Sequence, residues 1–105
     1  MNNRKKMYQT NTIIRKYLLE NDFIDLYFFP TLRFQKDYNL EDAKFDGIGF
    51  KKNDRRIYLM QFKTNCKLSK NVLEIYKKLE KKYYIKCIWV NRIKGNNVEI
   101  YNLKK

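Results

Sequence analysis

The most constraining feature of the sequence is a pair of alternating runs, residues 45–50 and 57–63, joined by a short polar link. Alternation with a period of two residues is typical of strands that bury one face. The link contains Asn53-Asp54, a pair suited to a two-residue turn. The pattern therefore predicts a β-hairpin around which the rest of the chain is organised.

This hairpin is expected to bring three polar side chains to one face. A turn at the predicted position sets Asp46 opposite Gln61, where Cβ atoms lie about 5 Å apart. Lys63 comes two residues after Gln61 and therefore shares its face. A carboxylate, an amide oxygen and an ammonium can hold a divalent cation and a phosphate. The simpler alternative is a solvated sheet face on which these residues bind nothing.

Length and composition predict a single domain spanning residues 1–105. Hydrophobic residues make up 44% of the chain, and three glycines and one proline leave no linker. No apolar run approaches the roughly 20 residues of a membrane span, and the N-terminus lacks the apolar segment of a signal peptide. We therefore expect a soluble protein in the cytoplasm.

The chain contains no histidine, and this limits its chemistry. Ser-His-Asp and Cys-His catalysis are excluded. Cys66 and Cys87 lack the spacing of a zinc site and are expected to be free thiols. Any reaction must therefore use carboxylates, lysine, tyrosine or a metal.

The charge of the chain is strongly positive, with 24 Lys and Arg against 11 Asp and Glu, a net charge of +13. Such an excess predicts a polyanionic partner, because each neutralised phosphate releases counterions. Nucleic acid is the first candidate and a membrane surface the second, although the sequence shows no basic helix with a broad apolar face. A lysine-rich solvated surface is the remaining alternative.

Periodicity predicts an α/β fold, a small mixed sheet of about five strands with helices packed on it, in the order α-β-β-β-α-β-β. A stripe containing Tyr76 and Leu79 indicates that the second helix packs on the sheet, and Trp89 is assigned to the core. The predicted elements are a helix over 10–20, an inner strand over 23–29, the hairpin, a helix capped by Ser69, and strands over 85–90 and 98–103.

Residues 31–44 show no clear period. We interpret them as a loop that covers a substrate groove or, equally, as a short strand leading into the hairpin. Several basic residues on this segment and on the outer face of the second helix are assigned to nucleic-acid binding. These are Arg33, Lys36, Lys44, Lys70 and Lys77.

Three stretches, in this order along the chain, carry a further resemblance. They are LLENDF at the end of the first helix, FDGIGF with Asp46, and MQFKTN with Gln61-Phe62-Lys63. They resemble the PD-(D/E)xK nuclease superfamily, most closely its small archaeal-type Holliday-junction resolvases. Gln61-Phe62-Lys63 stands where the family has (D/E)-x-K. The resemblance covers residues 9–90 and implies a restriction-endonuclease-like fold.

The resemblance also implies an activity, a metal-dependent DNA endonuclease that cuts branched DNA as a homodimer. Asp46, Gln61 and Lys63 would be the catalytic residues. Asp46 would be the central Mg²⁺ or Mn²⁺ ligand, joined by the Gln61 oxygen and the backbone carbonyl of Phe62. Lys63 would orient the attacking water and stabilise charge on the phosphate.

The chain departs from the family pattern at two positions. Gln61 replaces an acid, as in some active members, including the endonuclease subunit of certain heteromeric transposases. Asn11 stands where the resolvases have a glutamate, and Glu20 and Thr64 are further candidates for the site. Because an amide adds no charge to a metal site, a catalytically silent nuclease-fold protein that binds nucleic acid by charge, alone or as a subunit, is the alternative.

Overall fold

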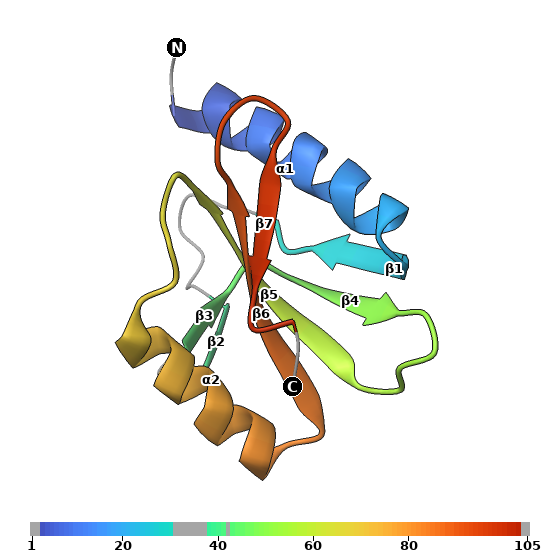
Figure 1. Ribbon diagram of the computed structural model, residues 1–105, viewed down its shortest axis with the longest axis vertical. Coiled ribbons are helices and arrows are strands. Elements are labelled where there is room, and N and C mark those ends of the chain that lie inside the picture. The colour runs from blue at the N-terminus through green and yellow to red at the C-terminus, as the bar shows by residue number, and fades with distance from the viewer. Residues whose placement is uncertain (1–2, 31–37, 42, 104–105) are drawn as a thin grey trace.

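A computed structural model describes residues 3–30, 38–41 and 43–103. Within these residues two helices pack on a five-stranded mixed sheet, which confirms the predicted α/β class. Figure 1 shows the sheet between α1 and α2. The elements are α1 (Asn3–Glu20), β1 (Phe23–Phe28), β2 (Tyr38–Leu40), β3 (Ala43–Phe45), β4 (Gly47–Lys51), β5 (Ile57–Thr64), α2 (Lys70–Lys82), β6 (Ile85–Arg92) and β7 (Val98–Tyr101).

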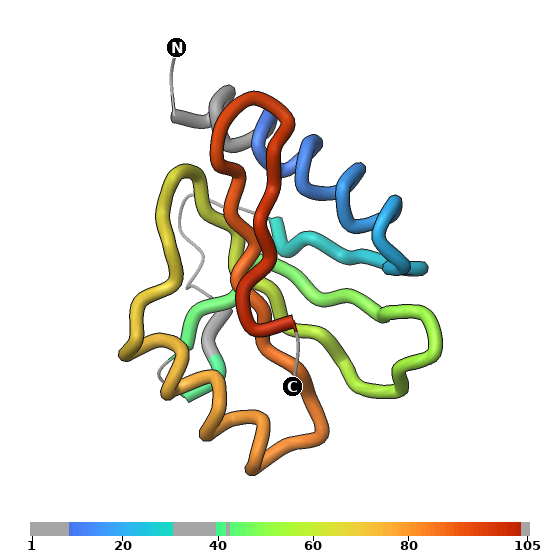
Figure 2. Tube along the Cα trace, viewed as in Figure 1, coloured from blue at the N-terminus to red at the C-terminus, as the bar shows by residue number. Residues whose placement is uncertain are grey.

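The five-stranded sheet has the order β1-β4-β5-β6-β7. Neighbouring strands are antiparallel except β5 and β6, which run parallel. A parallel pair requires a crossover connection, and α2 supplies it. The tube in Figure 2 shows the turn between β6 and β7 reaching α1. No helix among the described residues is long and apolar enough to span a membrane.

The element order differs from the predicted one because β2 and β3 form a separate two-stranded sheet beside α2 (Figure 1). Residues 31–44 were interpreted as a loop or as a short strand that leads into the hairpin. β2 lies within this segment and β3 overlaps its end, so the strand interpretation is correct for residues 43–45. Glu41, in the turn between these strands, has φ 54° and forms an ion pair with Lys82 on α2. Residues 31–37, with Arg33 and Lys36, lie outside the described part of the chain.

The hairpin of β4 and β5 has the predicted register. Its pairs are Gly47 with Met60, Ile48 with Leu59, and Gly49 with Tyr58. The first strand is shorter than predicted, because the chain bends at Asp46 between β3 and β4. Asp46 therefore lies at the end of the ladder instead of within it.

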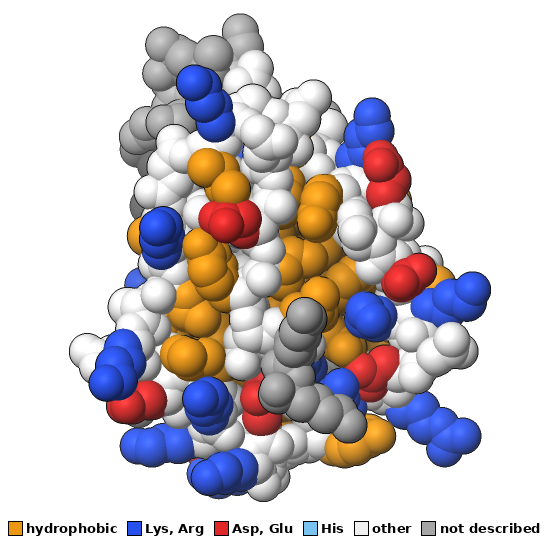
Figure 3. All heavy atoms as spheres, viewed as in Figure 1, with side chains coloured by type: hydrophobic (Ala, Val, Ile, Leu, Met, Phe, Trp, Pro, Cys, Tyr) orange, Lys and Arg blue, Asp and Glu red, His pale blue; other side chains and the backbone are white. Residues whose placement is uncertain are grey.

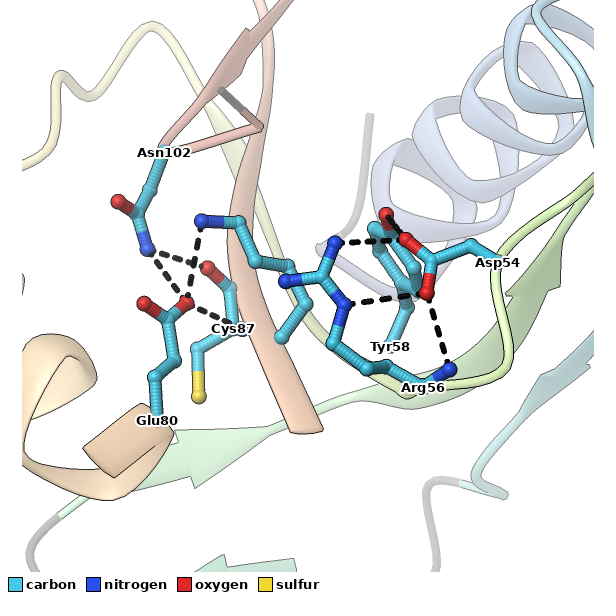
Figure 4. A network of polar contacts seen from close by, with 7 residues as sticks. Asp54, Arg56, Tyr58, Glu80, Cys87 and Asn102 are labelled. Atoms are coloured by element: carbon cyan, nitrogen blue, oxygen red, sulfur yellow. Dashed lines mark hydrogen bonds and ion pairs between the residues drawn. The ribbon is translucent and has the colours of Figure 1, made fainter. Parts of the chain in front are cut away.

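The turn of the hairpin is not the predicted two-residue turn. Asp54 donates its backbone N–H to the Lys51 carbonyl at 3.1 Å, and Asn53 has φ 63°. The Asp54 carboxylate then accepts hydrogen bonds from Arg56 Nη2 at 2.7 Å and from the Tyr58 hydroxyl at 2.6 Å (Figure 4). These side-chain bonds stabilise a longer link than the sequence pattern predicted.

β1 is a further correction, because we expected an inner strand buried on both faces. Among the described strands it lies at the edge of the sheet, and Ile24 and Tyr27 are 67% and 57% exposed. α1 covers only the face that carries Phe23 and Leu26. A run of apolar residues indicates a strand but does not reveal its place in the sheet.

Two hydrophobic cores lie on opposite faces of the sheet. The core under α1 contains Ile14, Leu18, Tyr58, Met60, Ile88 and Val90. The core under α2 contains Phe45, Tyr76, Leu79, Cys87 and Trp89. Because side chains alternate along a strand, the even-numbered residues of β5 face α1, and Gln61 and Lys63 face α2.

The helix ends follow local chemistry. α2 begins as predicted, since the Ser69 hydroxyl accepts the Val72 N–H at 3.3 Å. Its other end is held by Glu80, whose carboxylate accepts the Cys87 N–H and the Asn102 amide, both at 2.9 Å (Figure 4). α1 begins at Asn3, earlier than predicted, because residues 4–9 include Arg, Lys, Met and Gln, which favour helix without forming an apolar stripe.

Candidate active site

Asp46 lies where three strands meet. Its N–H donates to the Met60 carbonyl of β5 at 2.7 Å, and its carbonyl accepts the Phe29 N–H, just after β1, at 2.8 Å. Its carboxylate oxygen Oδ2 accepts the backbone N–H of Phe62 at 2.9 Å. These bonds fix both the backbone and the carboxylate of Asp46 beside β5.

The Phe62 carbonyl, predicted as a metal ligand, points to the same lateral side of β5 as Asp46. The N–H and C=O of one residue in a strand point to the same neighbour, and the Phe62 N–H points to Asp46. Three residues later, the Asn65 N–H points to the opposite side of β5, where it donates to the Arg92 carbonyl of β6. Asp46 and the Phe62 carbonyl are therefore at the same edge.

Gln61 and Lys63 project from β5 on the α2 side, where both are half-buried. The Tyr76 hydroxyl donates to Gln61 Oε1 at 3.4 Å. Lys63 Nζ lies 5.5 Å from the centroid of the Trp89 ring, a cation–π distance. The helix and β6 therefore each supply one aromatic neighbour to this pair.

Tyr76 connects the pair to Asp46. Its side chain is fully buried, and its ring stacks on Phe45 with a centroid distance of 5.8 Å. Burial raises the pKa of Tyr76 well above its usual value, and negative charge at Cys87 and Asp46 adds to the effect. The Tyr76 hydroxyl therefore stays protonated and lies within the field of the Asp46 carboxylate.

Gly47 allows β1 to approach the chain next to Asp46. A Cβ atom at this position would lie 2.8 Å from the Tyr27 carbonyl oxygen and 3.3 Å from Phe28 Cα. Both are backbone atoms, so a larger residue cannot be accommodated by rotating a side chain. The close approach of β1 therefore explains why a glycine follows Asp46.

Two further predicted residues lie on the other side of the sheet. Thr64 faces α1, and its hydroxyl lies 3.1 Å from that of Thr10. Asn11 is half-buried on α1, one turn before Arg15, whose guanidinium carbon lies 4.5 Å from the centroid of the Phe28 ring. Thr64 and Asn11 are thus separated from Gln61 and Lys63 by the sheet.

Glu20 lies far from Asp46. It is exposed at the end of α1, just before β1 begins at Phe23, which pairs with Lys51. Asp46 lies beyond the opposite end of β1. The intervening six residues span about 20 Å at the rise of a β-strand, so Glu20 does not join the site.

The basic residues predicted to bind nucleic acid are exposed where the structure describes them. These are Lys44 on β3 and Lys70 and Lys77 on α2. Figure 3 shows Lys and Arg side chains along the part of the surface formed by α2, with acidic side chains interspersed. Arg33 and Lys36 are outside the described residues.

Tyr76 and Trp89 are the site residues that sequence reasoning did not identify. Both were assigned to the core, and both are buried. The helical stripe signalled that Tyr76 packs inward, but the partner of its hydroxyl comes from β5. No local pattern connects Tyr76 with Gln61.

The oxygen donors that Asp46, Gln61 and Phe62 supply are of the kind that bind Mg²⁺ or Mn²⁺. Among the described residues, no group of three or more His, Cys, Asp and Glu side chains is arranged around a metal position. The available donors are the Asp46 carboxylate, the Gln61 amide oxygen and the Phe62 carbonyl. Mg²⁺ prefers hard oxygen ligands and often binds through one or two carboxylates, waters and substrate phosphates. The oxygen donors therefore fit such an ion.

No family model, curated protein or solved structure matches the chain. Its function is therefore inferred from the geometry of the site and the charge of the surface.

Proposed function

We propose that the chain is a Mg²⁺- or Mn²⁺-dependent DNA endonuclease of the PD-(D/E)xK type. The observation that carries the proposal is the meeting of Asp46 with the Gln61-Phe62-Lys63 strand. The Asp46 carboxylate accepts the Phe62 N–H at 2.9 Å, and the buried Tyr76 hydroxyl donates to the Gln61 oxygen at 3.4 Å. These contacts support a site in which a negative ligand, neutral oxygens and an ammonium bind a metal ion and a phosphodiester together.

The residues of the chain divide the chemistry. The Asp46 carboxylate, the Gln61 oxygen and the Phe62 carbonyl would hold the metal, which would lower the pKa of its water and offset charge on the phosphate. Lys63 binds a phosphate oxygen and stabilises the charge that develops on it. In the hydrolysis a water oxygen forms a bond to phosphorus and the water gives up a proton, while a bridging P–O bond breaks and the leaving oxygen takes up a proton.

The charge of the surface supports a DNA substrate. The net charge is +13, and Lys44, Lys70 and Lys77 are exposed on the elements that flank the site. The proposal extends to a restriction-endonuclease-like fold, branched DNA such as a Holliday junction as substrate, and a cytoplasmic location. It includes a homodimer, because symmetric cutting of a junction requires two sites.

The test is a nicking assay on supercoiled DNA and on four-way junctions, with Mg²⁺, with Mn²⁺ and with EDTA. The matched variants are Asp46→Asn and Lys63→Met, which remove one charge each and preserve side-chain size. We expect metal-dependent cleavage by the wild-type protein and at least a hundredfold loss in each variant. Equal cleavage by wild type and both variants contradicts the assignment.

A second candidate is a catalytically silent protein of the same fold that binds nucleic acid by charge, alone or as a subunit. Asp46 is the one carboxylate among the donors described above, and this observation favours the second candidate, because affinity for a hard cation falls with ligand charge. It predicts salt-dependent DNA binding that EDTA does not change, and no cleavage. Cleavage that is lost in both variants eliminates it.

A further inference from the structure

The residue at position 61 is a glutamine, and an amide poses a problem that a carboxylate does not. Both oxygens of a carboxylate can ligate a cation, whereas an amide has one oxygen and an NH₂ group that repels it. The terminal torsion of glutamine is broad and roughly two-fold. Without a further contact, the amide therefore presents either group to the site.

In the structure, Tyr76 contacts the amide of Gln61 through its oxygen. Its hydroxyl donates to Gln61 Oε1 at 3.4 Å, and a carbonyl oxygen has a second lone pair for a cation. The ring cannot easily move away, because it is fully buried and stacks on Phe45, the residue before Asp46. Tyr76 belongs to α2, and this helix is itself fixed at both ends. The Ser69 cap holds its beginning, and the contact from Glu80 to Cys87 of β6 holds its end.

We infer that Tyr76 is a positioning residue that orients the Gln61 amide so that its oxygen, and not its nitrogen, serves the metal. This inference rests on the proposed function, because it concerns the same metal site. It also gives a reason why glutamine can replace the acid at this position: the buried hydroxyl supplies the orientation that an amide requires. Groups that orient metal ligands typically contribute 10- to 100-fold in affinity.

The inference is tested by a double-mutant cycle that combines Tyr76→Phe with Gln61→Glu. Tyr76→Phe removes only the hydroxyl and keeps the ring that stacks on Phe45. Because a carboxylate needs no orientation, the hydroxyl is expected to matter when residue 61 is the native glutamine and not after Gln61→Glu. If the hydroxyl only supports packing, Tyr76→Phe would change metal binding equally with glutamine and with glutamate at position 61.

The measurement is Mn²⁺ binding to each purified protein without DNA, by electron paramagnetic resonance of the free ion, with thermal unfolding to confirm the fold. We expect Tyr76→Phe to weaken binding about tenfold in the native background and less than about threefold in the Gln61→Glu background. Equal weakening in both, or none in either, overturns the positioning role while the metal site stands. Absence of Mn²⁺ binding by the wild-type protein overturns the metal site itself and the positioning role with it.

Discussion

The carboxylate of Asp46 accepts the backbone N–H of Phe62 at 2.9 Å, across the bend where β3 ends and β4 begins. This bond has two consequences. It holds the only charged ligand of the proposed site in one orientation, and it satisfies a backbone donor that the short ladder leaves without a strand partner. The first role concerns activity, and the second concerns stability.

The two roles can be separated by substituting Asp46 with Asn or Ala. Asparagine removes the charge but keeps an oxygen that accepts the Phe62 N–H, whereas alanine removes both. We expect both variants to lose DNA nicking. Urea unfolding should show a loss of about 0.5–1.5 kcal/mol for Asp46→Ala, the usual contribution of one hydrogen bond, and little change for Asp46→Asn. Equal stability of the two variants would exclude a structural role for the bond.

Gly47 provides a steric test of how the site is held. Gly47→Ala places a Cβ atom 2.8 Å from the Tyr27 carbonyl oxygen, so β1 and the Asp46 bend must separate. We expect a destabilisation of about 1–3 kcal/mol and at least a tenfold loss of nicking at a temperature where the variant is folded.

Gly95→Ala is the matched control for this substitution. Gly95 has φ +58°, and a Cβ atom there meets nothing within 4 Å. The variant should lose roughly 1 kcal/mol from its backbone conformation and keep full nicking. A similar loss of nicking in both variants would show that the effect of Gly47→Ala is not local.

The hairpin turn predicts a dependence of stability on acid pH. Hydrogen bonds from the Arg56 side chain, aided by Tyr58 and opposed by burial, hold the pKa of the Asp54 carboxyl well below its usual value. In acid the unfolded chain therefore binds a proton that the folded chain does not. The stabilisation is complete above about pH 4 and is lost as the pH falls toward the lower pKa of the folded state.

Asp54→Asn tests this dependence. The substitution should lower the free energy of unfolding at pH 7 by about 1.5–3 kcal/mol, the range for hydrogen bonds to charged groups. The difference from the wild type should shrink in urea titrations performed below pH 4. A difference that stays constant between pH 7 and pH 2.5 would contradict the assigned cause.

The charge of α2 predicts how DNA binding depends on salt. Lys77 on α2 and Lys16 on α1 are both exposed, and Lys77→Gln and Lys16→Gln each remove one positive charge. If DNA lies along α2, Lys77→Gln should reduce the slope of log K against log salt concentration by about 0.9, the value for one phosphate contact. Lys16→Gln, on the opposite side of the sheet, should leave the slope unchanged. Equal changes would indicate binding without a preferred face.

Several elements were predictable because their causes are local. The Ser69 cap depends on residues within one helical turn, and the alternation of β4 and β5 reports which face each residue takes. The same alternation placed Gln61 and Lys63 together. The register of the hairpin, the helix cap at Ser69 and the shared face of Gln61 and Lys63 could therefore be predicted from residues close in sequence.

Other features depend on contacts between distant residues, and the sequence pattern missed them. The bend at Asp46 is maintained by hydrogen bonds to Phe29 and Met60, and no local signal distinguishes it from a continuous strand. The exposed position of β1 follows from the strand order of the whole sheet. A short apolar strand has the same sequence pattern at the edge of a sheet as in its middle.

The sequence by itself determined the class of the fold, the hairpin register, the positive charge and the three residue types proposed for the chemistry. These follow from composition and from periodicity over a few residues. Only the tertiary structure decided that Tyr76 donates to Gln61, that Asp46 bonds Phe62, and that Thr64 and Glu20 lie apart from them. The physical reason is that a hydrogen bond between distant residues requires the packed sheet and helices to bring its two atoms within bonding distance.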